Sequence, residues 1–218
     1  AKKLVQGQVD IDGIFGPTET IVIADDSARP EFCAADLIAQ AEHDPLATAI
    51  LVTNSEKLVR DIEAELDRQL AKIARGDLAR SALERQGRVV LVDSLDEAVE
   101  LANRIAPEHL CLMIADPWAW AGKVKNAGGL FLGEFSPEVM GDYIAGPSHV
   151  MPTGGTARFA NGLSANDFLK RSSVIRYDRR SLASAADDVC RIAEAEGLDG
   201  HAASITIRLA DDDPTTTS

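Results

Sequence analysis

The sequence predicts an α/β fold built on a doubly wound, mainly parallel sheet, and two observations carry this prediction. Between residues 19 and 132, short runs of apolar and β-branched residues alternate with longer amphipathic stretches. The short runs have the length of buried strands, and the longer stretches have the length of helices. Repeated strand–helix units of this kind place helices on both faces of a parallel sheet.

The expected elements follow from these patterns in chain order. Strands are expected over residues 19–24, 48–53, 88–92, 109–114 and 129–132, and helices over residues 32–41, 56–73, 81–86, from 95 onward and 117–124. The first helix ends before Pro45, because the residue before a proline is pushed out of the α region. In the second helix apolar residues recur every four positions, at Leu58, Ile62, Leu66 and Leu70. The segment 94–97 carries an N-cap signature for the helix that follows it.

The character of the chain changes after Leu132. Residues 133–162 are dense in glycine and proline, which is typical of a long structured loop, and such loops are usually functional. Beyond this loop we expect a short strand over residues 173–177, a helix over 181–195 and a last strand marked by the alternation of Ile205, Ile207 and Leu209. The expected organisation is therefore a domain over residues 1–165, a small helical/strand appendage over 166–209 and a disordered tail over 210–218.

Composition narrows the classes of partner. The 218 residues include 22 Lys and Arg against 35 Asp and Glu, a net charge of −13, which argues against nucleic acid and anionic membrane as partners. No run approaches the roughly 18 apolar residues of a membrane span. Three scattered cysteines without C-x-x-C spacing suit a reducing cytoplasm. The chain opens without an initiator Met or a signal-peptide pattern, so we interpret it as an internal part of a longer protein.

Two pairs of residues are candidates for site chemistry. Gln40 and His43 stand three positions apart near a helix end, where an amide oxygen and an imidazole can project from one face and bind a divalent metal. The alternative is that His43 caps the last carbonyls of the helix. Glu108 and His109 lie just before a strand, where a carboxylate and an imidazole can exchange protons with a substrate. The alternative for this pair is a solvated loop.

The remaining candidates are single residues. Asp142 lies in the glycine-rich segment and offers an anionic oxygen ligand, although an isolated loop Asp is usually a turn former. His201 supplies another imidazole, or else is a surface histidine after a helix. Two His, one Asp and one Gln form a plausible nitrogen–oxygen site for Zn²⁺, but spacing alone does not show that they converge. There is no H-E-x-x-H and no G-x-G-x-x-G. By the general rule for open α/β sheets, we expect ligands beyond the carboxyl ends of the strands.

Five dispersed motifs resemble those of histidinol dehydrogenases in order and approximate spacing. They are Gly16-Pro17-Thr18-Glu19, Gln40-Ala41-Glu42-His43, Pro107-Glu108-His109-Leu110, Gly141-Asp142-Tyr143 and His149-Val150-Met151-Pro152-Thr153-Gly154-Gly155. The closing Gly200-His201, followed by the alternating residues, belongs to the same pattern. The resemblance covers residues 1 to about 209.

The resemblance implies a Zn²⁺- and NAD-dependent enzyme that oxidises L-histidinol to L-histidine in two hydride transfers. It implies Gln40, His43, Asp142 and His201 as ligands of one zinc per subunit. It implies Glu108 and His109 as the acid/base pair. Those zinc ligands and His109 are also expected to contact the substrate, together with Thr18 and Glu196, and His149 is expected near the pocket.

The resemblance further implies a homodimer whose C-terminal appendage brings Glu196 and His201 to the partner's active site. Family members are about twice as long, so the chain resembles their C-terminal half, an incomplete Rossmann-like domain, and the NAD site belongs to the half that is missing. We therefore expect that the chain alone does not turn over histidinol. Two alternatives stay open: a zinc- and imidazole-binding fragment without catalysis, and one half of a split enzyme.

Overall fold

The structure, a computed structural model, describes residues 1–210. It consists of two compact units, one from Ala1 to Leu169 and a second that begins at Lys170. We predicted a disordered tail over residues 210–218, and residues 211–218 lie outside the part of the chain that the structure describes. No helix within residues 1–210 is long and apolar enough to cross a membrane.

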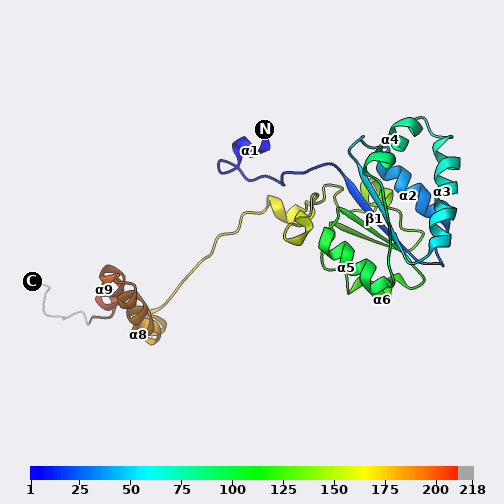
Figure 1. Ribbon diagram of the computed structural model, residues 1–218. Helices are drawn as coiled ribbons and strands as arrows, with labels where there is room; N and C mark the ends of the chain where they lie inside the picture. Colours follow the sequence, from blue (N-terminus) through cyan, green and yellow to red (C-terminus); the bar gives the residue numbers. More distant parts are fainter. Residues whose placement is uncertain (211–218) are drawn as a thin grey trace, which may run out of the picture. The chain divides into compact units, whose positions relative to one another are not determined.

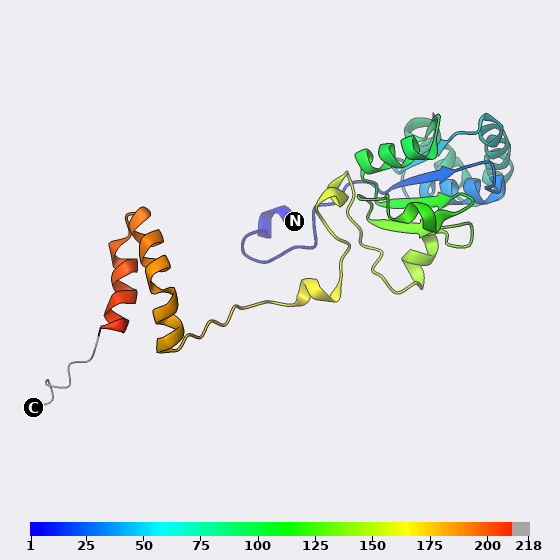
Figure 2. The same cartoon turned by 90° about the horizontal axis from the view of Figure 1, so that it is seen from below.

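The first unit is a five-stranded parallel sheet with helices on both faces (Figures 1 and 2). Its strands are β1 (Glu19–Ala24), β2 (Thr48–Thr53), β3 (Arg88–Leu91), β4 (His109–Met113) and β5 (Gly129–Leu132). They lie in the order β3-β2-β1-β4-β5, and every pairing is parallel. The order reverses direction at β1, as in a doubly wound sheet, so the predicted fold class is confirmed.

Every helix predicted between the strands is present with bounds within three residues, except that the helix predicted over residues 81–86 begins at Gly76. They are α2 (Pro30–Ala41), α3 (Glu56–Leu70), α4 (Gly76–Gln86), α5 (Leu95–Ile105) and α6 (Pro117–Ala121). Ser94 caps α5 as expected, because its hydroxyl accepts a hydrogen bond from the Glu97 N–H. The first unit also contains α1 (Lys2–Val5), α7 (Glu138–Tyr143) and two short 3-10 helices, Thr156–Arg158 and Ala165–Phe168.

The two faces of the sheet are covered by different helices (Figure 1). Successive strand residues point to opposite faces, so Val22 packs with α2 and α3 while Ile21 and Ile23 pack with α5. Ile62 of α3 is 1% exposed, and burying a side chain of that size contributes about 2 kcal/mol to stability. These contacts bury both faces of the central strands.

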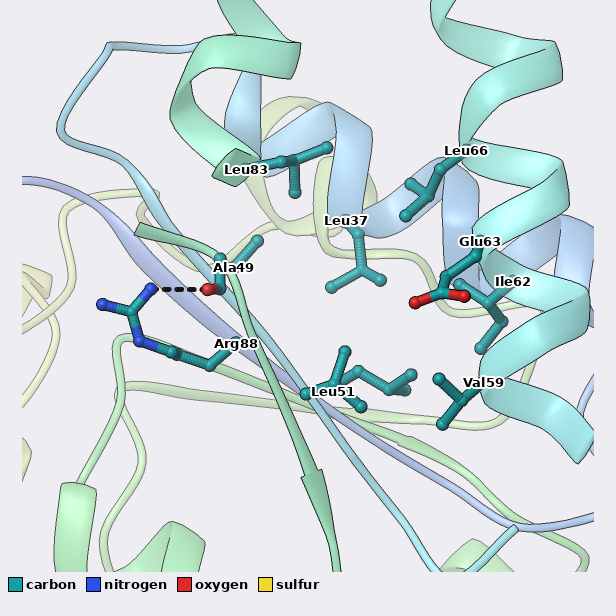
Figure 3. A pocket seen from close by; sticks show the side chains of 11 residues that line it. Leu37, Ala49, Leu51, Val59, Ile62, Glu63, Leu66, Leu83 and Arg88 are labelled. Carbon is teal, nitrogen blue, oxygen red and sulfur yellow. Dashed lines mark hydrogen bonds between the residues drawn. The ribbon is translucent and has the colours of Figure 1, made fainter. Parts of the chain in front are cut away.

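An apolar groove lies beside the edge strand β3 (Figure 3). Its volume is about 180 Å³, and side chains from α2, α3 and α4 project into it over β2. Arg88 lies at one side of the groove and donates a hydrogen bond to the carbonyl of Gly87 at 2.6 Å. Val89 and Leu91 of this strand are about half exposed. The groove shares no lining residue with the cavity described below.

Two predicted strands are wrong. Residues 205–209 belong to α9 (Asp199–Leu209), which packs against α8 (Arg179–Ala195) within the second unit. Ala202, Ile205 and Leu209 are the half-covered positions of α9, and their 3–4 spacing is helical, whereas Ile207 is exposed. Residues 173–177 form no strand and their apolar side chains are exposed.

Candidate active site

Glu108 and His109 stand at the start of β4 because α5 ends abruptly before them. Ala106 ends the helix in the left-handed region (φ 57°), the only non-glycine residue with positive φ among residues 1–210. Pro107 then cannot continue the helix. A left-handed alanine costs on the order of 1 kcal/mol, so tertiary packing holds this turn in place.

The Glu108 carboxylate is held by two donors at the start of β1. Its Oε2 accepts a hydrogen bond from the Thr18 hydroxyl at 2.6 Å and another from the Glu19 N–H at 3.2 Å. Glu108 is only 7% exposed. The carboxylate is thus fixed in one position beside His109, whose Nδ1 lies 3.8 Å from the same oxygen.

The His109 imidazole is buried without a hydrogen-bond partner. It is 5% exposed, pairs in register with Thr20 of β1, and lies with its ring centroid 5.9 Å from that of Phe131. Both Nδ1 and Nε2 lack a partner. Buried polar atoms are nearly always satisfied, so these two nitrogens, which have no partner within the protein, are candidates to bond a molecule that enters the site.

Gln40 lies in the last turn of α2, and His43 lies just beyond the helix end. The helix ends at Ala41, and His43 follows two residues later in the turn to β2. Gln40 is 1% exposed and donates from Nε2 to the Thr18 hydroxyl at 3.0 Å. His43 is exposed. His43 is therefore accessible from solvent, whereas the buried Gln40 is separated from solvent by Thr18.

Asp142 is in a helix, whereas the sequence placed it in a loop. It belongs to α7, which crosses the glycine-rich segment as a short helix. The glycines of residues 133–162 suggested an irregular loop, but Gly141 permits close packing of a helix. A Cβ on this residue would lie 2.9 Å from the Phe131 ring. Only a residue without a side chain lets α7 approach β5 this closely.

These residues converge on one cavity of about 520 Å³. It is lined by Thr18, His43, Glu108, His109, Asp142, Tyr143 and His149. A smaller cavity of about 200 Å³ shares Thr18, Glu108 and His149 with it. The segments that carry the first and last motifs are tied together, since Gly16 N–H donates to Thr153 Oγ1 at 2.7 Å and Gly154 N–H donates to Glu19 Oε1 at 2.9 Å.

The cavity lies at the amino ends of the strands, which corrects the expectation of a carboxyl-end site. Thr18 precedes β1, His43 precedes β2, and Glu108 precedes β4. At this edge α2 and α5 present their C-terminal ends, where the helix dipole places partial negative charge. This electrostatic setting favours a cation over the phosphate groups that helix N-termini attract at the opposite edge.

Two buried carboxyl groups in the first unit hold their protons more tightly than free carboxyls do. Burial raises the pKa of Glu138 to about 8, and the charges of Asp36, Asp142 and Glu108 act in the same direction. Burial likewise raises the pKa of Asp36 to about 6. Sequence reasoning missed Glu138 and Thr20, because nothing in a short helix or a strand marks a single polar residue as buried.

The potential metal donors of the first unit are few. Among residues 1–210 no three His, Cys, Asp or Glu side chains are grouped so that they could hold a metal ion by themselves. His43 and Asp142 line the cavity, and Gln40 contacts its wall through Thr18. This nitrogen–oxygen set fits a first-row divalent ion provided that a further donor arrives from elsewhere.

Glu196 and His201 belong to the second unit. Glu196 follows the end of α8, and His201 lies in the first turn of α9. Both side chains are exposed on that helical pair.

Comparisons with known proteins agree on one family. The family model described as "Histidinol dehydrogenase" matches residues 1–209. A curated histidinol dehydrogenase of Moorella thermoacetica is 52% identical over 208 residues, covering 95% of this chain and 49% of that protein. A curated histidinol dehydrogenase of Thermus thermophilus is 54% identical over 208 residues, covering 95% of this chain and 50% of that protein.

A solved structure gives the same result for the fold. The crystal structure of histidinol dehydrogenase from Elizabethkingia anophelis superposes with a TM-score of 0.92 at 37% identity, covering 95% of this chain and 48% of that one. The chain thus spans about half the length of the relatives that it matches.

Proposed function

This chain belongs to the histidinol dehydrogenase family, and on that premise we propose that it carries the zinc-binding and acid–base residues of an enzyme that oxidises L-histidinol to L-histidine with NAD. The observation that carries the proposal is the single cavity in which Thr18, His43, Glu108, His109 and Asp142 meet. These residues are spread over more than half the sequence, and packing gathers them at one edge of the sheet.

The proposed zinc ligands are Gln40, His43 and Asp142 from the first unit and His201 from the second unit of a partner subunit, one zinc per subunit. Support comes from the donor types and from the negative helix ends at this edge. When bound, zinc supplies a Lewis acid that orients the imidazole and amino nitrogens of the substrate. The acidic surroundings also suit a substrate that carries an amine.

The geometry of Glu108 and His109 supports the acid–base roles proposed for them. His109, whose ring nitrogens have no partner within the protein, would accept the proton of the alcohol as it is oxidised to the aldehyde, a step for which NAD⁺ would supply the hydride acceptor. That step gives the aldehyde and one NADH. Glu108, held by Thr18 and the Glu19 N–H, then removes a proton from the water that adds to the aldehyde, and a second hydride transfer gives the acid. Thr18 and His149, both on the cavity wall, contact the substrate.

The rest of the assembly belongs to the same proposal. The enzyme is a homodimer in which Glu196 and His201 of one subunit serve the other subunit's site. The NAD site lies in the half of the relatives that this chain does not span. Three unpaired cysteines are consistent with work in the reducing cytoplasm, as part of histidine biosynthesis.

A chimera tests the proposed activity. The matching half of the Moorella thermoacetica relative is replaced by this chain, and NADH formation is followed with histidinol and NAD⁺. We expect two NADH per histidinol from the chimera and none from the 218-residue chain alone. The variants His109→Asn and Glu108→Gln should each lower kcat at least about 100-fold, because general acid–base catalysis contributes that much. Activity of the isolated chain would refute the expectation that it needs the other half, and parental kcat in both variants would refute the acid–base assignment.

Subunit complementation tests the shared site. Variants His43→Ala and His201→Ala are each expected to lose zinc. A mixed dimer of the two restores one complete site, because the intact His43 of one subunit meets the intact His201 of the other. Failure of the mixture to recover zinc would place all ligands within one subunit.

A further inference from the structure

Helix α7, which carries Asp142, is attached to the sheet at very few points. Of its six residues only Glu138 and Gly141 are buried, while Tyr143 is 83% exposed. Asp142 follows Glu138 by four positions, so the two side chains project from the same face of the helix. Whatever holds Glu138 therefore also sets the position of Asp142.

Glu138 is held by a residue in the middle of the sheet. It is 2% exposed, and its Oε2 is hydrogen-bonded to the hydroxyl of Thr20 on β1. The other buried position, Gly141, contributes only close packing against Phe131. The Glu138–Thr20 contact is the one side-chain hydrogen bond that the described structure gives to a buried residue of α7.

Thr20 also holds Gln40. Its hydroxyl donates to Gln40 Oε1 at 3.2 Å, while Gln40 Nε2 donates to Thr18 at 3.0 Å. The two threonines therefore hold the Gln40 amide between them, with its oxygen within hydrogen-bond distance of both hydroxyls. A hydroxyl has one hydrogen, so if Thr20 donates to Gln40 it must accept from Glu138, which requires the Glu138 carboxyl to be protonated. The Thr18 hydroxyl donates its hydrogen bond to the Glu108 carboxylate.

We propose that Thr20 and Glu138 are positioning residues that jointly set the places of Gln40 and Asp142, the two oxygen ligands of the proposed metal site. The inference rests on the proposed function, since it concerns the same site. Neither residue lines the cavity. Both act through the ligands that they hold, as the hydrogen-bond partners of metal ligands commonly do.

The experiment measures zinc affinity of the 218-residue chain by competition with a chromophoric chelator, and the visible absorption of the Co²⁺-loaded chain. Two matched pairs are compared: Thr20→Val with Thr20→Ser, and Glu138→Leu with Glu138→Gln. The first member of each pair removes the hydrogen bond and the second keeps it. Thr53→Val is the control, because Thr53 is equally buried and its hydroxyl accepts from Ser55 N–H at 3.1 Å. Asp142→Ala reports the loss of a ligand.

We expect Thr20→Val and Glu138→Leu to weaken zinc binding by about 10- to 100-fold and to change the Co²⁺ absorption bands. Thr20→Ser, Glu138→Gln and Thr53→Val should stay within about threefold of the parent, by the same reasoning. Thermal unfolding shows whether each variant is folded. If one hydrogen-bond-deleting variant does not fold, the other pair still decides.

The possible results distinguish failure of the positioning roles of Thr20 and Glu138 from failure of the proposed metal site. Parental affinity in both deletion variants, alongside a large loss in Asp142→Ala, would overturn the positioning roles alone. Equal losses in Thr20→Ser and Thr20→Val would also overturn them, because the hydroxyl would not be the cause. Parental affinity in Asp142→Ala would instead overturn the proposed metal site, and the positioning roles with it.

Discussion

Glu138 makes the stability of this chain depend on pH in a defined way. It is 2% exposed, and burial raises its pKa from the ordinary value of 4.5 to about 8. Between these two pH values the unfolded chain has lost the proton and the folded chain keeps it. Since the folded state then binds more protons, the free energy of unfolding falls as pH rises.

The size of the effect follows from the same two values. Each pKa unit corresponds to about 1.4 kcal/mol, so the loss amounts to about 2 kcal/mol between pH 6 and pH 8, and levels off above pH 8 where both states are ionised. The Asp36 carboxyl, whose pKa burial raises to about 6, contributes in the same direction mainly below this window. Glu138→Gln is the matched variant, because the amide is a neutral isostere of the protonated acid and can donate to Thr20.

The assay is urea unfolding of the metal-free chain in the presence of a chelator, followed by circular dichroism at pH 6, 7 and 8. We expect the free energy of unfolding of the parent to fall relative to that of Glu138→Gln by about 2 kcal/mol across this range. Parallel curves would show that Glu138 is already ionised in the folded chain at pH 6. A Glu138→Gln chain that fails to fold would equally refute the protonated form.

Two further predictions concern other parts of the first unit and the cysteines. Thr18→Val removes the 2.6 Å hydrogen bond to the Glu108 carboxylate, and a bond to a charged group contributes about 1.5–3 kcal/mol. The kcat of the chimera should therefore fall about 10- to 100-fold in Thr18→Val and stay within a few-fold in Thr18→Ser. An unchanged kcat in Thr18→Val would contradict the role of that bond. Burial raises the pKa of the Cys33 thiol to about 12 and that of Cys111 well above its usual range. Brief iodoacetamide treatment at pH 8, followed by intact-mass measurement, should therefore label only Cys190 in the folded chain and all three cysteines in urea. Labelling of Cys33 or Cys111 without urea would contradict their burial.

Much of the fold could be predicted because its signals are local. The β-branched runs and the amphipathic stretches gave every strand of the sheet and the helices between them, and the Ser94 cap marked the start of α5. The last strand was wrong because an alternation of three residues is too short to outweigh the 3–4 spacing of Ala202, Ile205 and Leu209. That helix becomes evident only when its partner α8 is present to cover one side.

The candidate site was only partly predictable, for a physical reason. Residue types and spacing indicated Glu108, His109, His43 and Asp142, and the structure brings them to one cavity. Their meeting depends on the strand order, which places β1 between β2 and β4 and so aligns the amino ends of the three. The general expectation of a carboxyl-end site pointed to the opposite edge.

The roles proposed for Thr20 and Glu138 could not be predicted from the sequence. Thr20 reads as an ordinary β-branched strand residue, and Glu138 as a surface carboxylate in a loop. Their importance lies in contacts over 118 positions of sequence, made when α7 is brought against β1. Only the folded arrangement shows that one hydroxyl serves both Glu138 and Gln40.

We have proposed that the cavity at the amino ends of β1, β2 and β4 binds a metal ion. The most direct measurement is the zinc content of the purified chain and of His43→Ala, by elemental analysis on material of known mass in solution. We expect about one zinc per chain in a dimeric parent and a nearly zinc-free variant. Equal zinc in both, or a folded dimeric parent without zinc, would contradict it.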